Sequence, residues 1–151
     1  MANSQAMASS FKSEILAGIH ALGTTVVRAG TGADTIKAAL YLASASKGAS
    51  STTYDTTGEV TGTNYTAGGV TVTNANSPST SGTTGIWTPS ASIVYTNVTL
   101  STAFDAVMLY NSTQGDKTIS VHTFGSQTVT AGTFTLTMPT NDASNALIRI
   151  A

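Results

Sequence analysis

Imidazole groups, which could supply acid–base catalysis or metal ligands, occur at only two positions, His20 and His122. A serine nucleophile would need one of them beside it, and a carboxylate to orient the ring. The abundant serines include no Gly-x-Ser-x-Gly motif that would place a hydroxyl in that role. Cysteine is absent, which excludes thiolate zinc sites and disulfides. We interpret both histidines as structural or surface residues and predict no enzymatic activity.

Two of the seven acidic residues, Asp55 and Glu59, are four positions apart. A helical turn over residues 54–59 would place both carboxylates on one face, as in the acid and base pair of a glycosidase. The glycine-rich surroundings favour a capping or turn role instead. The sequence contains no Asp-x-Asp-x-Asp-Gly calcium loop and no lysine-bearing phosphate loop. It therefore predicts neither a metal site nor a cofactor.

A third carboxylate, Asp105, lies inside the longest apolar run of the chain, residues 104–110. Turn-forming residues flank this run, and its β-branched and aromatic members predict a central strand that is buried on both faces. A carboxylate in a buried strand needs a partner. We expect Lys37 or Arg149, from other strands, to provide it.

The composition is poor in charge. Charged residues make up 9% of the 151 positions and the net charge is −1, whereas an ordinary globular domain has about 25%. Nucleic-acid binding needs clustered lysine and arginine, which are missing here. The sequence also contains no run of about 18 apolar residues, the length that a membrane-spanning helix needs. A surface that is polar through hydroxyl groups has little self-repulsion, so it suits a protein that packs against neighbours.

Hydrophobic periodicity predicts one helix and several strands. The helix covers residues 11–22, and its apolar stripe consists of Phe11, Ile15, Ile19 and Leu22. The predicted strands are residues 35–42, 70–73, 93–100, 104–110, 119–123, 134–138 and 147–150. The alternation changes phase after Tyr95, which predicts a bulge near Thr96 and Asn97.

The order of these elements predicts a mainly β fold. We expect an antiparallel β-sandwich or jelly-roll-like domain with one N-terminal amphipathic helix. The polar residues 1–10 are predicted to form a flexible or partner-ordered arm, and residues 11–151 a single β-rich domain. Residues 74–84 combine many turn formers and are expected to be an exposed loop.

Several stretches taken together resemble a family of small structural proteins encoded by tailed bacteriophages. The most specific is residues 54–69, Tyr-Asp-Thr-Thr-Gly-Glu-Val-Thr-Gly-Thr-Asn-Tyr-Thr-Ala-Gly-Gly, and the next is the final Ile-Arg-Ile-Ala. Residues 36–41, 106–114, 121–127 and 132–136 extend the resemblance over nearly the whole chain. Residues 74–84 match no motif of that family.

The resemblance implies a virion component, most consistent with a capsid decoration (cement) protein. Alternatives are a tail, neck or fibre component, or a glycan-binding module that stacks Trp87, Tyr95 and Tyr65 on sugars. The implied partners are the major capsid protein and further copies of the chain, with a trimer favoured. The N-terminus lacks signal-peptide features, so we expect assembly in the bacterial host cytoplasm. The predicted interface residues are Asn3, Ser4, Gln5, Phe11, Ile15, Trp87 and Tyr65. Deletion of residues 2–10 is expected to weaken capsid binding without unfolding the domain.

Overall fold

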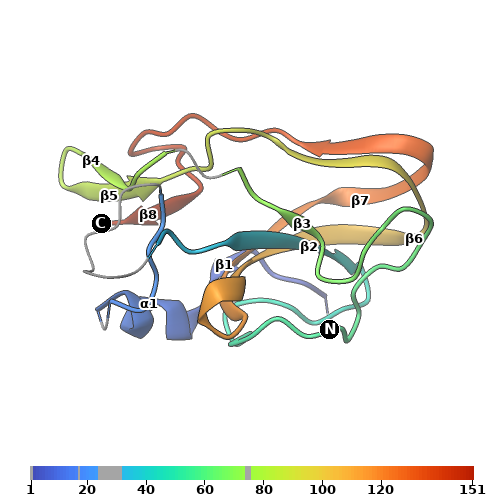
Figure 1. The fold of residues 1–151 in the computed structure, drawn as a ribbon, viewed down its shortest axis with the longest axis horizontal. Coiled ribbons are helices and arrows are strands. Elements are labelled where there is room, and N and C mark those ends of the chain that lie inside the picture. The colour runs from blue at the N-terminus through green and yellow to red at the C-terminus, as the bar shows by residue number, and fades with distance from the viewer. Residues whose placement is uncertain (1, 17, 24–31, 74–75) are drawn as a thin grey trace.

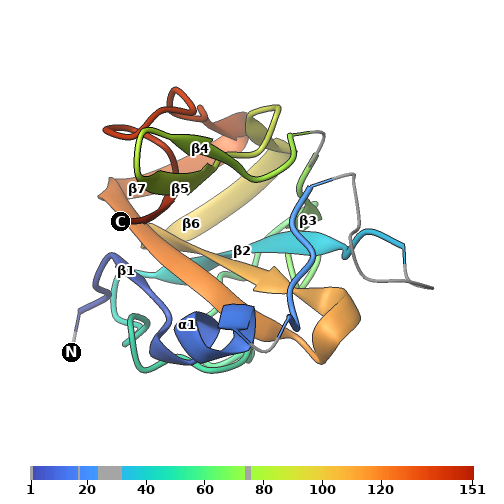
Figure 2. The ribbon, with the colours of Figure 1, turned by 90° about the vertical axis from the view of Figure 1, so that its left-hand side faces the viewer.

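A computed structural model describes residues 2–16, 18–23, 32–73 and 76–151. Within these residues the fold is mainly β, with two antiparallel sheets, as the sequence predicts (Figure 1). One sheet has the order β1-β7-β6-β2-β3 and the other β4-β5-β8. The strands are β1 (Ala6–Met7), β2 (Ile36–Leu42), β3 (Val70–Thr71), β4 (Ser79–Ser81), β5 (Thr84–Trp87), β6 (Ile93–Asn111), β7 (Lys117–Leu136) and β8 (Ile148–Ile150). Figure 2 shows the three-stranded sheet at the top of the view and the helix α1 (Ser9–Leu16) at the bottom.

The long hairpin of β6 and β7 is the largest element of the fold. A 3-10 turn, η1 (Ser112–Gln114), joins its strands, and the Asn111 side chain caps this turn by accepting hydrogen bonds from two backbone N–H groups. Gly115 then adopts a left-handed conformation with φ of 67°, which glycine reaches without a steric penalty. The segments predicted at residues 119–123 and 134–138 therefore belong largely to one continuous strand.

The hairpin folds back on itself, as the curled ribbons at the right of Figure 1 show. The β6–β7 register shifts between Leu100 and Phe104, and again between Phe104 and Ala106. The fold-back brings the Phe134 ring within 5.0 Å of the Phe104 ring centroid. The bend thus encloses an aromatic cluster, which buries a large apolar area at low conformational cost.

The central strand prediction for residues 104–110 is confirmed. Phe104, Val107 and Leu109 belong to one core cluster, and Ala106, Met108 and Tyr110 to a second. Because alternate residues of a strand point to opposite faces, both faces of β6 are buried in this region. Trp87 of β5 and Ile148 of β8 join the first cluster, so the two sheets share a core.

The predicted bulge near Thr96 and Asn97 is also confirmed. The β6–β7 register shifts between Tyr95 and Val98, and Asn97 has a φ of 53°. The predicted loop at residues 74–84 needs correction, because β4 and the start of β5 form a short hairpin there. Residues 74 and 75 lie outside the described residues.

The helix is shorter than predicted. It ends at Leu16 instead of reaching Leu22, and Ala17 is outside the described residues. Gly18 has a φ of 67°. The Gly18 N–H donates to the Ile15 carbonyl and the Ile19 N–H to the Glu14 carbonyl, both at 2.9 Å. This pair of hydrogen bonds with a left-handed glycine is the Schellman motif, which ends a helix. The apolar residues at positions 19 and 22 keep the helical spacing although the helix has already ended.

The N-terminal segment also departs from the prediction of a loose arm. The Asn3 amide donates to the Leu42 carbonyl at 3.0 Å and to Asp105 Oδ1 at 2.6 Å. Ala6 and Met7 then pair with β7 as strand β1. Residues 2–10 are therefore ordered by the domain itself, and their deletion is now expected to destabilise the fold as well.

Candidate functional site

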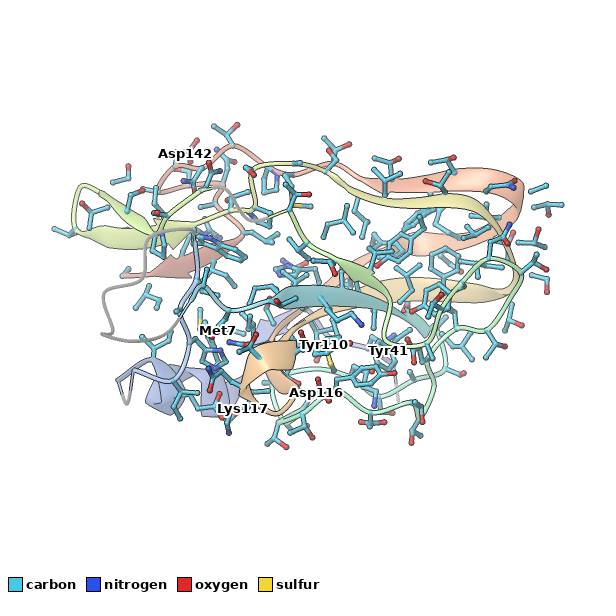
Figure 3. The ribbon with its side chains drawn as sticks, in the orientation of Figure 1. Met7, Tyr41, Tyr110, Asp116, Lys117 and Asp142 are labelled. Carbon is cyan, nitrogen blue, oxygen red and sulfur yellow. The ribbon has the colours of Figure 1, made fainter. Side chains whose placement is uncertain are left out.

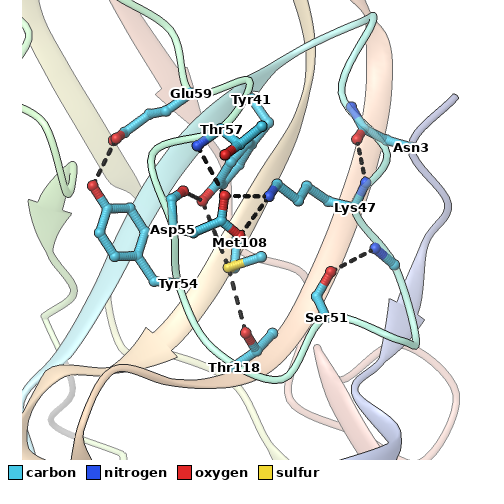
Figure 4. A network of polar contacts seen from close by, with 11 residues as sticks. Asn3, Tyr41, Lys47, Ser51, Tyr54, Asp55, Thr57, Glu59, Met108 and Thr118 are labelled. Atoms are coloured by element: carbon cyan, nitrogen blue, oxygen red, sulfur yellow. Dashed lines mark hydrogen bonds and ion pairs between the residues drawn. The ribbon is translucent and has the colours of Figure 1, made fainter. Parts of the chain in front are cut away.

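The Glu59 carboxylate is the polar centre of residues 54–69, the most specific stretch of the sequence. Its side chain is buried, with 7% of the residue exposed. Oε1 accepts hydrogen bonds from the Tyr65 hydroxyl and the Gly68 N–H, both at 2.8 Å. Oε2 accepts one from the Tyr54 hydroxyl at 2.7 Å, which Figure 4 shows. Three donors satisfy this buried carboxylate, as burial requires.

Tyrosines connect this carboxylate to the five-stranded sheet. The Tyr65 hydroxyl accepts a hydrogen bond from the Leu40 N–H of β2 at 3.0 Å. The Tyr110 hydroxyl of β6 donates to the Gly68 carbonyl at 2.8 Å, and its ring stacks on Tyr54 at 4.6 Å. Burial raises the pKa of Tyr110 to about 12. The phenol therefore stays a neutral hydrogen-bond donor at physiological pH. This favours a structural role, in which Tyr110 holds Gly68 against the sheet, over acid–base chemistry.

Glycines let the same stretch lie directly on the sheet. A Cβ on Gly69 would lie 1.6 Å from the Ala38 carbonyl oxygen, and one on Gly62 would lie 2.0 Å from the Thr99 carbonyl oxygen. Gly69 also has a φ of 69°. Only glycine tolerates both the close approach and the left-handed backbone, so these positions explain the glycine spacing of the segment.

Asp55 and Glu59 do not form the shared carboxylate face considered above. Residues 54–59 are not helical, and Asp55 pairs instead with Lys47, whose Nζ lies 2.8 and 2.7 Å from the two carboxylate oxygens. Burial raises the pKa of Asp55, but hydrogen bonds from Lys47 and the Thr57 N–H outweigh it and hold that pKa below its usual value. Each carboxylate thus has its own set of donors within the chain.

A second polar cluster fixes α1 to the tip of the hairpin. Glu14 is buried; its Oε2 lies 2.8 Å from His20 Nε2 and its Oε1 lies 2.9 Å from Lys117 Nζ. Figure 3 shows Lys117 at the start of β7, beside α1. Burial raises the pKa of Glu14, but the hydrogen bonds from His20 and Lys117 outweigh it, and the pKa lies below its usual value of 4.5.

The same cluster assigns the proton of His20. The side-chain oxygen of Asn111, Oδ1, already accepts the capping hydrogen bonds of η1, so the side-chain nitrogen Nδ2 is the atom that faces His20 Nδ1 at 3.1 Å. An amide N–H can only donate. Nδ1 is therefore the acceptor, and Nε2 carries the proton that is donated to Glu14.

His122 lies on β7, with Nε2 2.8 Å from the Ser120 hydroxyl. Burial lowers the pKa of His122 to about 4, so the ring is neutral at physiological pH. Ser120 is only 1% exposed. Among the described residues no carboxylate contacts this ring, although a catalytic serine needs one to orient its histidine. The arrangement therefore favours a structural hydrogen bond.

The structure places the predicted interface residues in different environments. Ser4 and Gln5 are exposed, Asn3, Ile15 and Tyr65 are half-buried, and Phe11 and Trp87 are in the core. The Trp87 indole donates to the Asn76 carbonyl at 3.1 Å. Phe11 and Trp87 are therefore covered by their own chain, which corrects that part of the prediction. Because Tyr95 is also buried, no aromatic platform for sugars forms from this trio.

The expected partner of Asp105 is also corrected. Asn3 fills that position, instead of Lys37 or Arg149. The Arg149 guanidinium donates to the Ser144 carbonyl. Asp105 is only half-buried, so solvent and the Asn3 amide together satisfy its carboxylate without a cationic partner.

One surface was not anticipated from the sequence. Residues 61–67, 96–103 and 125–131 contain no Asp, Glu, Lys, Arg or His and meet at one end of the molecule, at the right of Figure 1. Thr63 and Thr99 exchange two backbone hydrogen bonds of 3.1 Å, and the Asn64 amide donates to the Asn97 carbonyl at 2.8 Å. The Ala131 N–H donates to the Thr99 hydroxyl at 2.9 Å. We call these three segments the uncharged face.

Comparison with known proteins gives no match to a family model, a curated protein or a solved structure. Within the described part of the chain, no three His, Asp or Glu side chains gather where they could hold a metal ion. The helices described here are also too short and too polar to cross a membrane. The candidate site is the uncharged face, because its three segments present exposed hydroxyl and amide groups together at one end of the molecule.

Replacement of Glu14 by Gln is expected to make stability less dependent on pH. The folded-state pKa of Glu14 is below its usual 4.5, so its contribution is complete above that pH and is lost as pH falls through the folded pKa. We expect E14Q to lower the free energy of unfolding by about 1–3 kcal/mol at pH 7, and by less at pH 3. Urea unfolding at both pH values measures this difference. D116N, at an exposed turn position, is the control. Equal losses for E14Q at both pH values would contradict the assignment.

Proposed function

We propose that this chain is a structural protein of a tailed-bacteriophage virion, and that it decorates the outer surface of the capsid in many copies. The observation that carries the proposal is the uncharged face. Residues 61–67, 96–103 and 125–131 bring exposed hydroxyl and amide groups together without a charged side chain. The resemblance of residues 54–69 to phage structural proteins supports the same role.

A decoration protein places many copies of one chain side by side on a lattice. Copies that stand side by side at high local density repel each other when their contact surfaces carry like charges. An uncharged surface avoids this penalty, and it can bind a neighbour without desolvating ionised groups. Hydroxyl and amide groups retain directional hydrogen bonds, which supply specificity.

The buried polar groups support a non-catalytic role. Glu59 and Glu14 accept hydrogen bonds that fasten a loop and a helix to the sheet. The partner of a capsid decoration protein is the major capsid protein, which this chain would bind after its synthesis in the host cytoplasm. Because the N-terminal segment pairs with β7, the uncharged face is a better candidate for the lattice contact than a free arm.

The copy number of the protein in purified virions tests this assignment. Quantitative mass spectrometry against the major capsid protein is expected to give a ratio near one or a simple fraction set by the lattice. Tail-tube and portal proteins in the same particles provide the control for components present in few copies. A handful to a few dozen copies would assign the protein to the tail or neck instead. Absence from virions would overturn the structural role.

A charge introduced on the uncharged face tests which surface meets the shell. Thr66→Glu adds a carboxylate at an exposed position of residues 61–67, and its burial against the lattice without a partner is unfavourable. Co-sedimentation with expanded capsids that lack the protein should show binding weaker by about tenfold, which corresponds to about 1.4 kcal/mol. Thr80→Glu, on β4 at the other end of the molecule, is the control. Unchanged binding of T66E would exclude this face.

A further inference from the structure

We propose that the outer edge of β7, at Gly132 to Leu136, pairs with the same segment of a second copy of this chain. The inference concerns the isolated protein and does not depend on the virion assignment. The only strand beside β7 on that side, among the described residues, is β1, which covers Ser120 and Val121.

The remaining edge has backbone groups available for pairing. Alternate residues of an edge strand point their N–H and C=O groups away from the sheet. Within the described part of the chain, no further backbone hydrogen bond reaches residues 132–136 from that side. On the other side Phe134, Thr135 and Leu136 pair in register with β6, and the bulge at Thr96 and Asn97 lies next to them, between the Phe134 and Gly132 pairs. The edge is therefore extended at Phe134 to Leu136, as a template for another strand must be.

The side chains at this edge lack the devices that block strand addition. Natural edge strands are protected by lysine, by proline or by inward-pointing charges. Residues 132–136 are Gly-Thr-Phe-Thr-Leu and contain none of them. Ala131, with a φ of 44°, marks an irregularity that limits the regular segment on one side. Pairing is thus confined to a short, defined stretch.

A second copy is the occupant that fits this edge. Antiparallel pairing about a two-fold axis is self-complementary, because each donor on one strand meets an acceptor of the other. When the two-fold axis passes through the Phe134 pair, antiparallel pairing places Thr133 of one copy opposite Thr135 of the other, which is a favourable cross-strand pair. A charge-free segment also meets its own copy without repulsion.

An exposed apolar side chain lies beside the same edge. Val94, directly across the ladder from Thr135, is 42% exposed and is one of two large hydrophobic residues that the described chain leaves exposed. Because Val94 lies on β6, one strand inside the edge, a strand added to β7 extends the sheet without covering this side chain. The association therefore depends on the backbone hydrogen bonds and the Thr133–Thr135 pairs. This two-fold contact is an alternative to the trimer that the sequence favours.

Sedimentation equilibrium and light scattering on the purified full chain test the proposal. The wild-type protein should approach twice the chain mass of 15.2 kDa as its concentration rises. The double variant T133K/T135K should weaken the dimer by at least about tenfold, because lysines opposite one another repel. Thr133 and Thr135 are exposed, so the fold should survive, and circular dichroism checks this.

The matched control is T80K/T83K, which adds the same charge at exposed positions of the β4 hairpin and should leave the dimer unchanged. Hydrogen exchange provides a second measurement on the wild-type chain: amides of residues 132–136 should become more protected at high concentration. A monomer at every concentration, a trimer, or a dimer that persists in T133K/T135K would overturn the proposal.

Discussion

The buried carboxylate of Glu59 is the interaction on which the arrangement of this molecule depends. Its three hydrogen bonds come from Tyr54, Tyr65 and Gly68, and so gather both ends of one long segment at a single point. A buried carboxylate without such donors would be strongly unfavourable, and the donors without their acceptor would be unsatisfied in turn. The group therefore fixes the segment in one position on the sheet.

That position creates the surface on which the functional proposal rests. Fastening residues 54–69 to β2 and β6 places Thr63 and Asn64 against the bent part of β6. The aromatic cluster inside the bend holds the two layers of the hairpin together. The outer side of the bend carries hydroxyl and amide groups, a few small apolar residues and no charged side chain. The buried hydrogen bonds of Glu59 thus support the fold, and the uncharged face remains available for partners.

The sequence was most informative where burial follows from local pattern. The apolar run at residues 104–110 predicted a doubly buried strand, and the change of phase after Tyr95 predicted a bulge, because both are properties of one strand and its neighbours. It could not predict the fold-back of the hairpin. Local periodicity states which residues are buried, and not which distant residue buries them.

Distant polar pairs were missed for the same reason. Asn3 and Asp105 are 102 positions apart, and nothing in the pattern near either residue indicates the other. The end of the helix was mistaken because apolar residues continued at helical spacing after Gly18, although that glycine has the left-handed conformation that ends a helix. The glycine spacing of residues 62–69 carried a signal of close backbone approach, but its target, the carbonyl groups of β2 and β6, emerges only from the tertiary structure.

Hydrogen exchange at the Gly68 amide tests the central role of Glu59 most directly. In the wild-type protein this amide should exchange as slowly as amides of the sheet, because its N–H is buried and donates to Oε1. Glu59→Ala removes the acceptor and should speed its exchange on the order of tenfold to a hundredfold, while the Met108 amide of β6 stays protected. Glu59→Gln retains one oxygen as an acceptor and should fall between the two. Equal protection of Gly68 in wild-type and E59A protein would contradict the account.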